Sequence, residues 1–207
     1  MRLLPGIALM GLVVVTSNIL VNFLILDGLL TWGAVTYPIA FLITDVTNRW
    51  YGPAAARRVV LAGFVTGILC SLIGTQVQLE YGPAVTLRVA VASGAGFLAA
   101  QLLDVGVFDR LRQGSWWRAP LASTLVGASV DTALFFTISF AGFISFGPAA
   151  DAATAWGREA APLLLAGPEV PLWVSLALAD WCVKITLAMI ALIPFRLIIR
   201  QRPSAPA

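Results

Sequence analysis

Long apolar runs separated by short polar connections make up almost the whole chain. A helix rises 1.5 Å per residue, so about 20 apolar residues cross the roughly 30 Å of hydrocarbon in a bilayer. A window of that length predicts an all-α, polytopic integral membrane protein with six transmembrane helices, forming a single transmembrane domain over residues 1–207. The predicted spans cover residues 5–26, 32–50, 59–76, 83–103, 119–146 and 172–199.

The composition agrees with a membrane protein and argues against an enzyme. Of the 207 residues, 59% are hydrophobic and 11% are charged, whereas soluble domains carry about 25% charged residues. Histidine is absent, which removes the commonest general base and metal ligand. Cys70 and Cys182 lie in apolar segments without a CxxC spacing. We therefore predict no catalytic activity, no metal and no cofactor, and the net charge of +3 indicates no nucleic-acid partner.

Arginines mark every second connection between the predicted spans. The connections between them carry acidic residues and, among basic residues, only Arg158. Because cytoplasmic loops carry an excess of basic residues, this alternation predicts six spans with both termini in the cytoplasm. The arginines on the predicted cytoplasmic side are Arg2, Arg49, Arg57, Arg58, Arg110, Arg112, Arg118, Arg196, Arg200 and Arg202.

The longest connection covers residues 147–171 and is rich in Ala, Gly and Pro. Its central Trp156 favours a loop with a short helix lying at the outer membrane interface. An irregular tether is the alternative, and the pattern does not separate the two.

Charged side chains inside the predicted spans are the strongest functional candidates. A charge at mid-membrane costs roughly 3 kcal/mol, so such a group faces a partner or a wet cavity. The helical rise puts Asp45 and Lys184 at similar depths, and it puts Arg88 within reach of Asp131. Asp131 has no opposite charge one turn away on its own helix, whereas Arg49 follows Asp45 by four residues near the end of its span. We therefore predict that at least one of the pairs Asp45 with Lys184 and Arg88 with Asp131 is in contact across helices.

Amide side chains and a further carboxylate add to these candidates. Asn18 and Asn22 lie one turn apart in the first span, where they either bind a polar ligand or hydrogen-bond to another helix. Gln101 and Asp104 share one face near the inner end of the fourth span. Asp104 either belongs to a site there or pairs with the arginines at the interface. The pattern leaves these alternatives open.

Two other stretches have a structural interpretation that competes with a functional one. Asp180 and Lys184 lie four residues apart, so they either neutralise each other within one helix or serve a site. The segment ASGAGFLAA in the fourth span is rich in small residues, but no strand precedes it and its glycines lie mid-span. We interpret it as close helix packing and not as a phosphate-binding loop.

Three longer stretches resemble the queuosine precursor transporter family of the vitamin uptake transporter group. They are TWGAVTYPIAFLITDVTNRWYGPAAARR, RVAVASGAGFLAAQLLDVGVFDRLRQGSWWRAPLASTLVGASVDTALFF and DWCVKITLAMI. The similar positions are S-N in the first span, P-x-x-F-L-x-T-D in the second, R-x-x-x-A-S and Q-x-x-D-V in the fourth, and W-W-x-A-P-x-A-S-T-L and D-T in the fifth. Together these positions are specific, although each alone is weak.

The resemblance implies an importer of 7-cyano-7-deazaguanine and 7-aminomethyl-7-deazaguanine in the bacterial inner membrane. Its partners would be the 7-deazaguanine base and the lipid bilayer, and a homodimer is allowed. The alternative is a substrate-binding membrane subunit of an energised multiprotein vitamin or nucleobase transporter. Where some relatives carry an amide in the fifth span, this chain has Ala128 or Ser129. A binding role is therefore expected of Asp131, Asn18 and Gln101 instead. The expected substrate-binding residues are Asp131, Asp45, Asn18, Asn22, Gln101, Tyr37, Phe41, Arg88, Ser123 and Lys184.

The chemistry of such a base fits these side chains. A guanine-like edge shows N1–H and N2–H₂ donors beside a carbonyl, so a carboxylate can accept from the donors while an amide or a cation meets the oxygen. The flat ring would stack on an aromatic face such as Tyr37, Phe41 or Phe135. Because the aminomethyl base is a cation and the cyano base is neutral, a pocket that accepts both should use its carboxylate on the shared edge. This favours Asp131 or Asp45.

Overall fold

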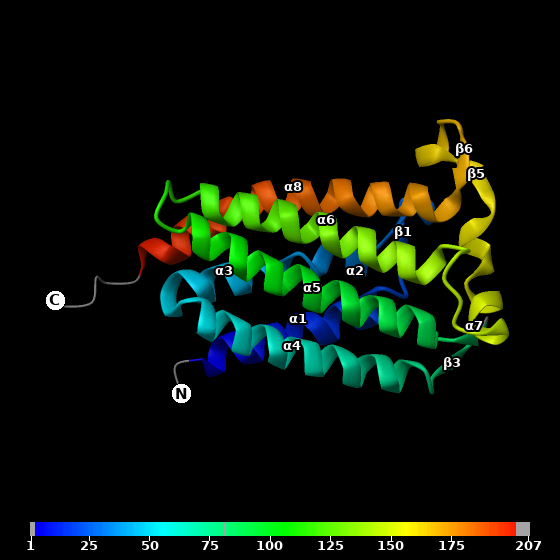
Figure 1. Ribbon diagram of the computed structural model, residues 1–207, viewed down its shortest axis with the longest axis horizontal. Coiled ribbons are helices and arrows are strands. Elements are labelled where there is room, and N and C mark those ends of the chain that lie inside the picture. Colours follow the sequence, from blue (N-terminus) through cyan, green and yellow to red (C-terminus); the bar gives the residue numbers. More distant parts are fainter. Residues whose placement is uncertain (1–2, 81, 202–207) are drawn as a thin grey trace.

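The computed structural model describes residues 3–80 and 82–201, and most of these residues are helical (Figure 1). Four of the described helices are long and apolar enough to cross a membrane. They are α4 (Pro53–Gly74), α5 (Leu87–Leu111), α6 (Arg118–Phe140) and α8 (Leu172–Arg200). The first helix, α1 (Leu4–Leu20), is apolar but has only 17 residues. Arg2 and Arg202 lie outside the described residues.

The second predicted span is broken into two helices and is not the continuous helix expected. Helix α2 (Trp32–Thr36) begins at Thr31, whose hydroxyl accepts from the Ala34 amide at 3.2 Å, and α3 (Ile39–Tyr51) begins after Pro38. Proline has no N–H to donate to the preceding turn, so the helical ladder is interrupted there. The break leaves the Tyr37 side chain at a junction inside the protein.

Three two-stranded antiparallel hairpins connect helices, and these short strands were not predicted. The first pairs β1 (Leu24–Ile25) with β2 (Leu30–Thr31), and the second pairs β3 (Gln78–Leu79) with β4 (Gly82–Pro83). The third pairs β5 (Ala160–Pro162) with β6 (Glu169–Pro171). In Figure 1, β1 lies part of the way along the bundle, whereas β3, β5 and β6 lie at its far end. The first two helical segments are therefore shorter than the bundle.

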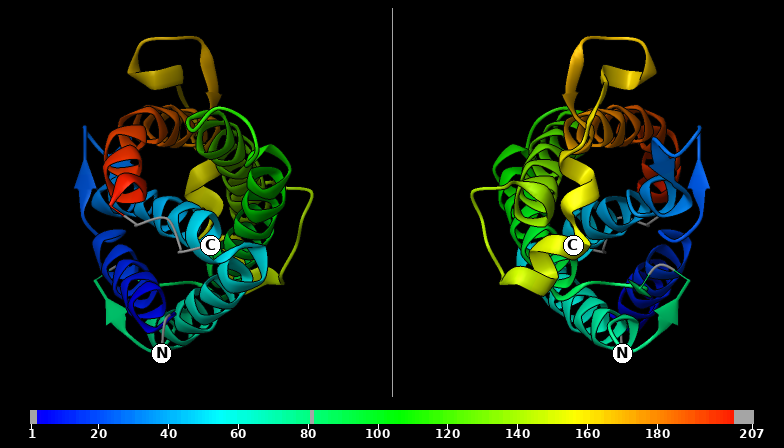
Figure 2. Two further views of the ribbon diagram at one scale, coloured as in Figure 1. Left: turned by 90° about the vertical axis from the view of Figure 1, so that its left-hand side faces the viewer. Right: turned by 90° about the vertical axis from the view of Figure 1, so that its right-hand side faces the viewer.

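The long connection contains the short helix that was predicted. Helix α7 (Pro148–Ala153) is followed by the 3₁₀ turns η1 (Ala155–Arg158) and η2 (Leu163–Leu165). The ring of Trp156 meets the ring of Phe140 edge-on, with centroids 5.0 Å apart. Viewed along the bundle, α7 and η1 cross over the interior of the ring of helices (Figure 2). The Trp156 ring therefore packs against the end of α6, while its side chain remains 48% exposed.

The two termini lie at the same end of the bundle, together with the junctions between α3 and α4 and between α5 and α6 (Figure 1). The main apolar core of the bundle is formed by side chains of α1, α3, α4 and α5, and it includes Met10, Val59 and Phe97. The small residues of ASGAGFLAA do allow close packing, as predicted. A Cβ on Gly96 would lie 3.0 Å from an oxygen of Asp131, so α5 approaches α6 at the depth of that carboxylate.

Candidate functional site

A partly open pocket of about 660 Å³ lies in the half of the bundle away from the termini. It exists because α1 and α2 stop short, while α4, α5, α6 and α8 continue past them. The hairpin of β1 and β2 lines one side, and Trp156 of η1 lines the pocket as well. A volume of this size is typical of sites for small molecules, about 300–1,000 Å³.

An ion-paired network of three charged side chains lies in the wall of this pocket. Lys184 of α8 binds Asp131 of α6 at 2.6 Å and Asp180 of its own helix at 2.5 Å. All three side chains are nearly buried, with Lys184 5% exposed and the two carboxylates 8% and 10% exposed. Two carboxylates and one ammonium group leave one formal negative charge. The network is thus suited to hydrogen-bond donors or to a cation.

Neutral hydroxyl groups complete the network and orient its carboxylates. Thr132 donates to Asp180 at 2.7 Å and accepts from Lys184 at 3.2 Å. Tyr37, at the break in the second span, donates to the Oδ1 atom of Asp131 at 3.3 Å. The ammonium of Lys184 also lies 5.5 Å from the centroid of the Tyr37 ring. Because Asp131 holds two different donors with its two oxygens, its orientation toward the pocket is set by α2, α6 and α8 together.

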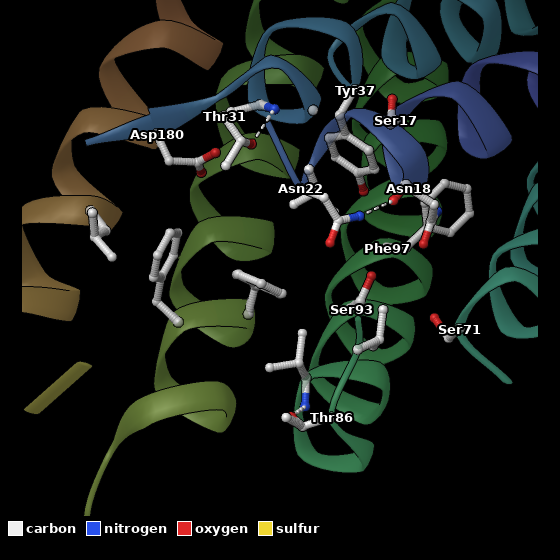
Figure 3. A pocket seen from close by; sticks show the side chains of 18 of the residues that line it. Ser17, Asn18, Asn22, Thr31, Tyr37, Ser71, Thr86, Ser93, Phe97 and Asp180 are labelled. Atoms are coloured by element: carbon white, nitrogen blue, oxygen red, sulfur yellow. Dashed lines mark hydrogen bonds between the residues drawn. The ribbon is translucent and has the colours of Figure 1, made fainter. Parts of the chain in front are cut away.

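Amide and hydroxyl groups from α1 and α5 face the same space. Asn18 and Asn22 donate their side-chain N–H groups to carbonyls of their own helix or the turn that follows it, at 2.9 and 3.2–3.3 Å. Their amide oxygens are left to face the pocket. These amide N–H groups do not form the hydrogen bonds to another helix that the sequence analysis considered. Figure 3 shows Asn18, Asn22 and Ser93 on one side of the pocket, with Asp180 on α8 across from them. Polar groups therefore converge from two sides.

Aromatic rings form much of the apolar wall. The rings of Tyr37 and Phe97 meet edge-on at 6.1 Å, and those of Phe135 and Phe136 do so at 5.1 Å. All four residues line the pocket. Flat rings beside a few fixed polar groups are the usual composition of a site for a heteroaromatic ligand.

A second polar cluster lies deeper, toward the end that carries the termini, and it does not line the pocket. Asp45 accepts hydrogen bonds from Ser123 at 3.2 Å and from Thr124 at 3.4 Å. Asp104, which is fully buried, interacts with Asp45. Gln101 is also fully buried and accepts from Thr44 at 2.6 Å.

The ten predicted binding residues are thus divided among three places. Asp131, Lys184, Tyr37, Asn18 and Asn22 line the pocket. Phe41, Asp45, Gln101 and Ser123 surround the deeper cluster instead, because their helix faces point away from the pocket. Arg88 belongs to neither place.

The predicted charge pairs are wrong, since neither Asp45 with Lys184 nor Arg88 with Asp131 is formed. Lys184 binds Asp131 and Asp180, and Arg88 binds Asp151 at 3.0 Å. The depth estimate counted residues from Trp32 as if it stood at the outer surface. Because β1, β2 and α2 begin part of the way along the bundle, Asp45 lies closer to the end with the termini than that count indicated.

Arg88 connects α5 to the outer segment that follows α6. It is fully buried, and it donates to the carbonyls of Ile138 and Ala141 at 2.7 and 2.6 Å as well as to Asp151 of α7. Asp151 also accepts from the Phe146 amide at 3.0 Å and from the Ser145 hydroxyl. These hydrogen bonds, the Phe146 amide first, lower the pKa of Asp151. Arg88 therefore holds the end of α6 and the helix α7 against α5.

Asp180 and Ser93, which line the pocket, and Thr132, which bonds Asp180 and Lys184, were absent from the predicted binding set. Asp180 does pair with Lys184 within α8, as one sequence interpretation held, but it also lines the pocket and accepts from Thr132. Thr132 and Ser93 were recognised only as positions shared with the resembling family. The D-T and A-S dipeptides were the available signals, although nothing in a linear pattern shows that Thr132 bonds Asp180 or that Ser93 lines the same pocket as Asn18.

The comparisons with known proteins agree with this arrangement. The family described as "Putative vitamin uptake transporter" matches residues 31–199. The chain is 34% identical over 196 residues to the "Queuosine precursor transporter" of Escherichia coli (strain K12), a match that covers 88% of this chain and 79% of that protein. The chain belongs to the queuosine precursor transporter family. Family members are thus transporters by name, and the broken second span and both polar clusters fall inside the matched region.

Further members of the family match shorter parts of the chain. A "Probable queuosine precursor transporter" of Haemophilus influenzae is 36% identical over 121 residues, covering 53% of this chain and 52% of that protein. One of Bacillus subtilis (strain 168) is 32% identical over 130 residues, covering 54% and 57%. No solved structure matches the chain.

Proposed function

We propose that this protein imports queuosine precursors, 7-cyano-7-deazaguanine or 7-aminomethyl-7-deazaguanine or both, across the bacterial inner membrane. The observation that carries the proposal is the Asp131 carboxylate, held by Tyr37 and Lys184 in the wall of an aromatic pocket of about 660 Å³. Family membership supplies the class of substrate, because the relatives are named for queuosine precursors.

The base would be recognised along its guanine-like edge. Asp131 would accept from the N1–H and N2–H₂ groups, since a carboxylate has lone pairs left after two hydrogen bonds. The amide oxygens of Asn18 and Asn22 can accept only, so they suit remaining N–H groups. The ring would lie against Tyr37 or Phe135, which line the pocket beside Asp131. The substituent at position 7 would then extend away from Asp131, which allows both precursors.

The membrane topology we propose has six crossings in one domain over residues 1–207, with both termini in the cytoplasm. Helix α1 makes the first crossing and α2 with α3 makes the second, and the hairpin of β1 and β2 joins them part of the way along the bundle. The positive-inside rule supports this orientation, because the basic junctions after α3 and α5 lie at the end that carries the termini. A fluorescent protein fused after Arg200 should fluoresce, and alkaline phosphatase inserted at Gly167 should be active. The reverse pair of results would overturn the orientation.

The transport function is tested with the purified full-length chain. Isothermal titration with 7-cyano-7-deazaguanine should show saturable binding, and proteoliposomes that contain only this chain should take up the radiolabelled base. Guanine added in excess serves as a competitor that shares the recognised edge. If neither precursor binds, the proposed substrate class is wrong. If the base binds but the chain alone exchanges none of it, the subunit alternative replaces the importer.

A further inference from the structure

The deeper polar cluster contains a carboxylate that has no hydrogen-bond donor. Asp104 is fully buried, and neither of its oxygens has a hydrogen-bond partner among the described residues. The Nε2 atom of Gln101, one turn before it, is also buried and unpartnered. The nearby Ser123 hydroxyl has one proton, which lies between Asp45 and the Pro120 carbonyl. Buried polar groups are nearly always satisfied, so the Asp104 oxygens require a proton or a hydrogen-bond donor.

The carboxylate of Asp45 interacts with this unsatisfied group. Asp45 is only 3% exposed, and Asp104 is the charged neighbour that acts on it. Its two oxygens accept from Ser123 and Thr124, which neutralise no charge. Two carboxylates that share a buried site cannot both ionise at low cost.

The charged groups of the packed helices are all engaged elsewhere or exposed. On α8, Lys184 is bound to Asp131 and Asp180, and Arg196 lies over the ring of Trp116. Arg49 of α3 donates to the Arg112 carbonyl, and Arg112 of α5 donates to Asp109 and to the Asn48 carbonyl. The remaining described arginines on these helices and on α4 are exposed, namely Arg57, Arg58, Arg110, Arg118 and Arg200. No described lysine or arginine therefore neutralises the two carboxylates.

A small cavity lies directly beside Asp45. Its volume is about 10 Å³, and it is lined by Asp45, Thr124 and apolar residues of α8 as far as Phe195. About 10–15 Å³ is the smallest space that holds one water molecule. The cavity extends along α8 toward the end that carries the termini, so a single water there could carry a proton between Asp45 and the cytoplasmic side.

We propose that Asp45 and Asp104 hold one proton between them and form the site at which proton movement is coupled to transport. An O–H bond forms on one carboxyl and donates to the other, and the proton leaves when that same bond breaks, so no electrons are exchanged. The proton would enter from the outer pocket and leave through the water-sized cavity. The coupling role, though not the proton site itself, rests on the proposed transport function.

The second span provides a physical link between this site and the pocket. Tyr37, Phe41 and Asp45 follow one another at four-residue intervals, and the rings of Tyr37 and Phe41 meet edge-on at 6.1 Å. Tyr37 donates to Asp131 in the pocket, while Asp45 belongs to the proton site. A shift of α3 that accompanies the loss of the proton would therefore move the Tyr37 hydroxyl that orients Asp131.

The test measures three properties of the full-length protein in proteoliposomes with radiolabelled 7-cyano-7-deazaguanine. These are binding, exchange of internal for external base, and accumulation driven by an acidic exterior with the membrane potential clamped at zero. For one proton per neutral base, the wild type should accumulate about tenfold for each unit of pH difference. Asp45→Asn and Asp104→Asn should each keep binding and exchange within about threefold but lose the pH-driven accumulation. Asp109→Asn, which changes a half-buried aspartate of the same helix that pairs with Arg112, should accumulate like the wild type.

The outcomes separate this proposal from the proposed function. A wild type that neither binds nor exchanges the base refutes the transport function, and titration of substrate-free protein with a pH-sensitive dye then decides the proton site alone. There, the double variant Asp45→Asn with Asp104→Asn should take up one proton fewer than the wild type between pH 9 and pH 4. Accumulation that follows a sodium gradient, or normal pH-driven accumulation by either Asn variant, would overturn the proton site. If one single variant fails to fold, the other decides, because each removes one of the two carboxyls that share the proton.

Discussion

Replacing Asp131 with Asn separates a binding role from a purely structural one at the centre of the pocket. The change removes the charge that Lys184 meets at 2.6 Å and turns one oxygen into an N–H₂ donor. Lys184 is not left alone, since Asp180 remains 2.5 Å from its ammonium. The Tyr37 hydroxyl also keeps an acceptor, provided that the remaining oxygen stays at the Oδ1 position. The perturbation is therefore local.

The expected magnitudes follow from these contacts. Removing one partner of a buried ion pair usually costs about 3–5 kcal/mol of stability, because an uncompensated charge stays buried. Here the second carboxylate compensates the ammonium, so we expect a loss nearer to one charge-assisted hydrogen bond, about 2 kcal/mol. For the base, a donor would now face a donor, at a cost of about 2 kcal/mol, which corresponds to roughly 30-fold weaker binding.

The assay combines isothermal titration with 7-cyano-7-deazaguanine and thermal unfolding of the same purified samples. Asp180→Asn is the matched control, because it removes a charge from the same ammonium and leaves Asp131 in place. It should lower the unfolding temperature about as much as Asp131→Asn does, while binding weakens less than fivefold. Wild-type affinity in Asp131→Asn, with only its unfolding temperature lowered, would refute the reasoning and leave Asp131 as a structural partner of Lys184.

Three further results are expected from other parts of the molecule. Asn18→Ala should weaken binding of the base about fivefold, which is the equivalent of one hydrogen bond of about 1 kcal/mol. The unfolding temperature should not change, because the Asn18 amide bonds only its own helix. Titration calorimetry checks the affinity, and melting curves check the unfolding temperature. The pKa of Asp151 is lowered, first by the hydrogen bond from the Phe146 amide. The ionised Asp151 should therefore hold α7 in place at pH values above the ordinary carboxyl pKa of about 4, and α7 should be released as the pH falls through the lowered pKa. Pepsin should therefore cut the 147–171 segment of the wild type faster at the acidic end of the enzyme's pH range, and it should cut Asp151→Asn fast at every pH. Equal cleavage of both proteins at every pH would contradict this role of Asp151. Gly127→Val should destabilise the protein by about 1–3 kcal/mol, because a Cβ there would lie 2.7 Å from the Phe41 ring, whereas Gly106→Val, with open space at its Cβ, should be better tolerated in the same melting assay.

The sequence alone determined the helical segments and the polar residues that matter. Apolar runs of 20 residues have few stable forms in a bilayer, so α4, α5, α6 and α8 lie close to the predicted ranges. Buried charges are costly wherever they lie, so Asp45, Asp131 and Lys184 could be singled out without coordinates. Local composition allowed the short helix after α6 without deciding between it and an irregular tether.

Only the tertiary structure decided which of these polar residues meet. Helical rise places a side chain along the axis, but its neighbours depend on helix order, on rotation about each axis and on where each segment begins. The break at Pro38 and the hairpin before it shifted Asp45 away from Lys184 and toward Asp104. Close approach of α5 to α6 at Gly96, and of α8 to α6 at Thr132, then joined Asp131 to Lys184. Such contacts join residues far apart in the chain, 53 positions for Asp131 and Lys184, and no local pattern encodes them, because they result from packing the whole bundle.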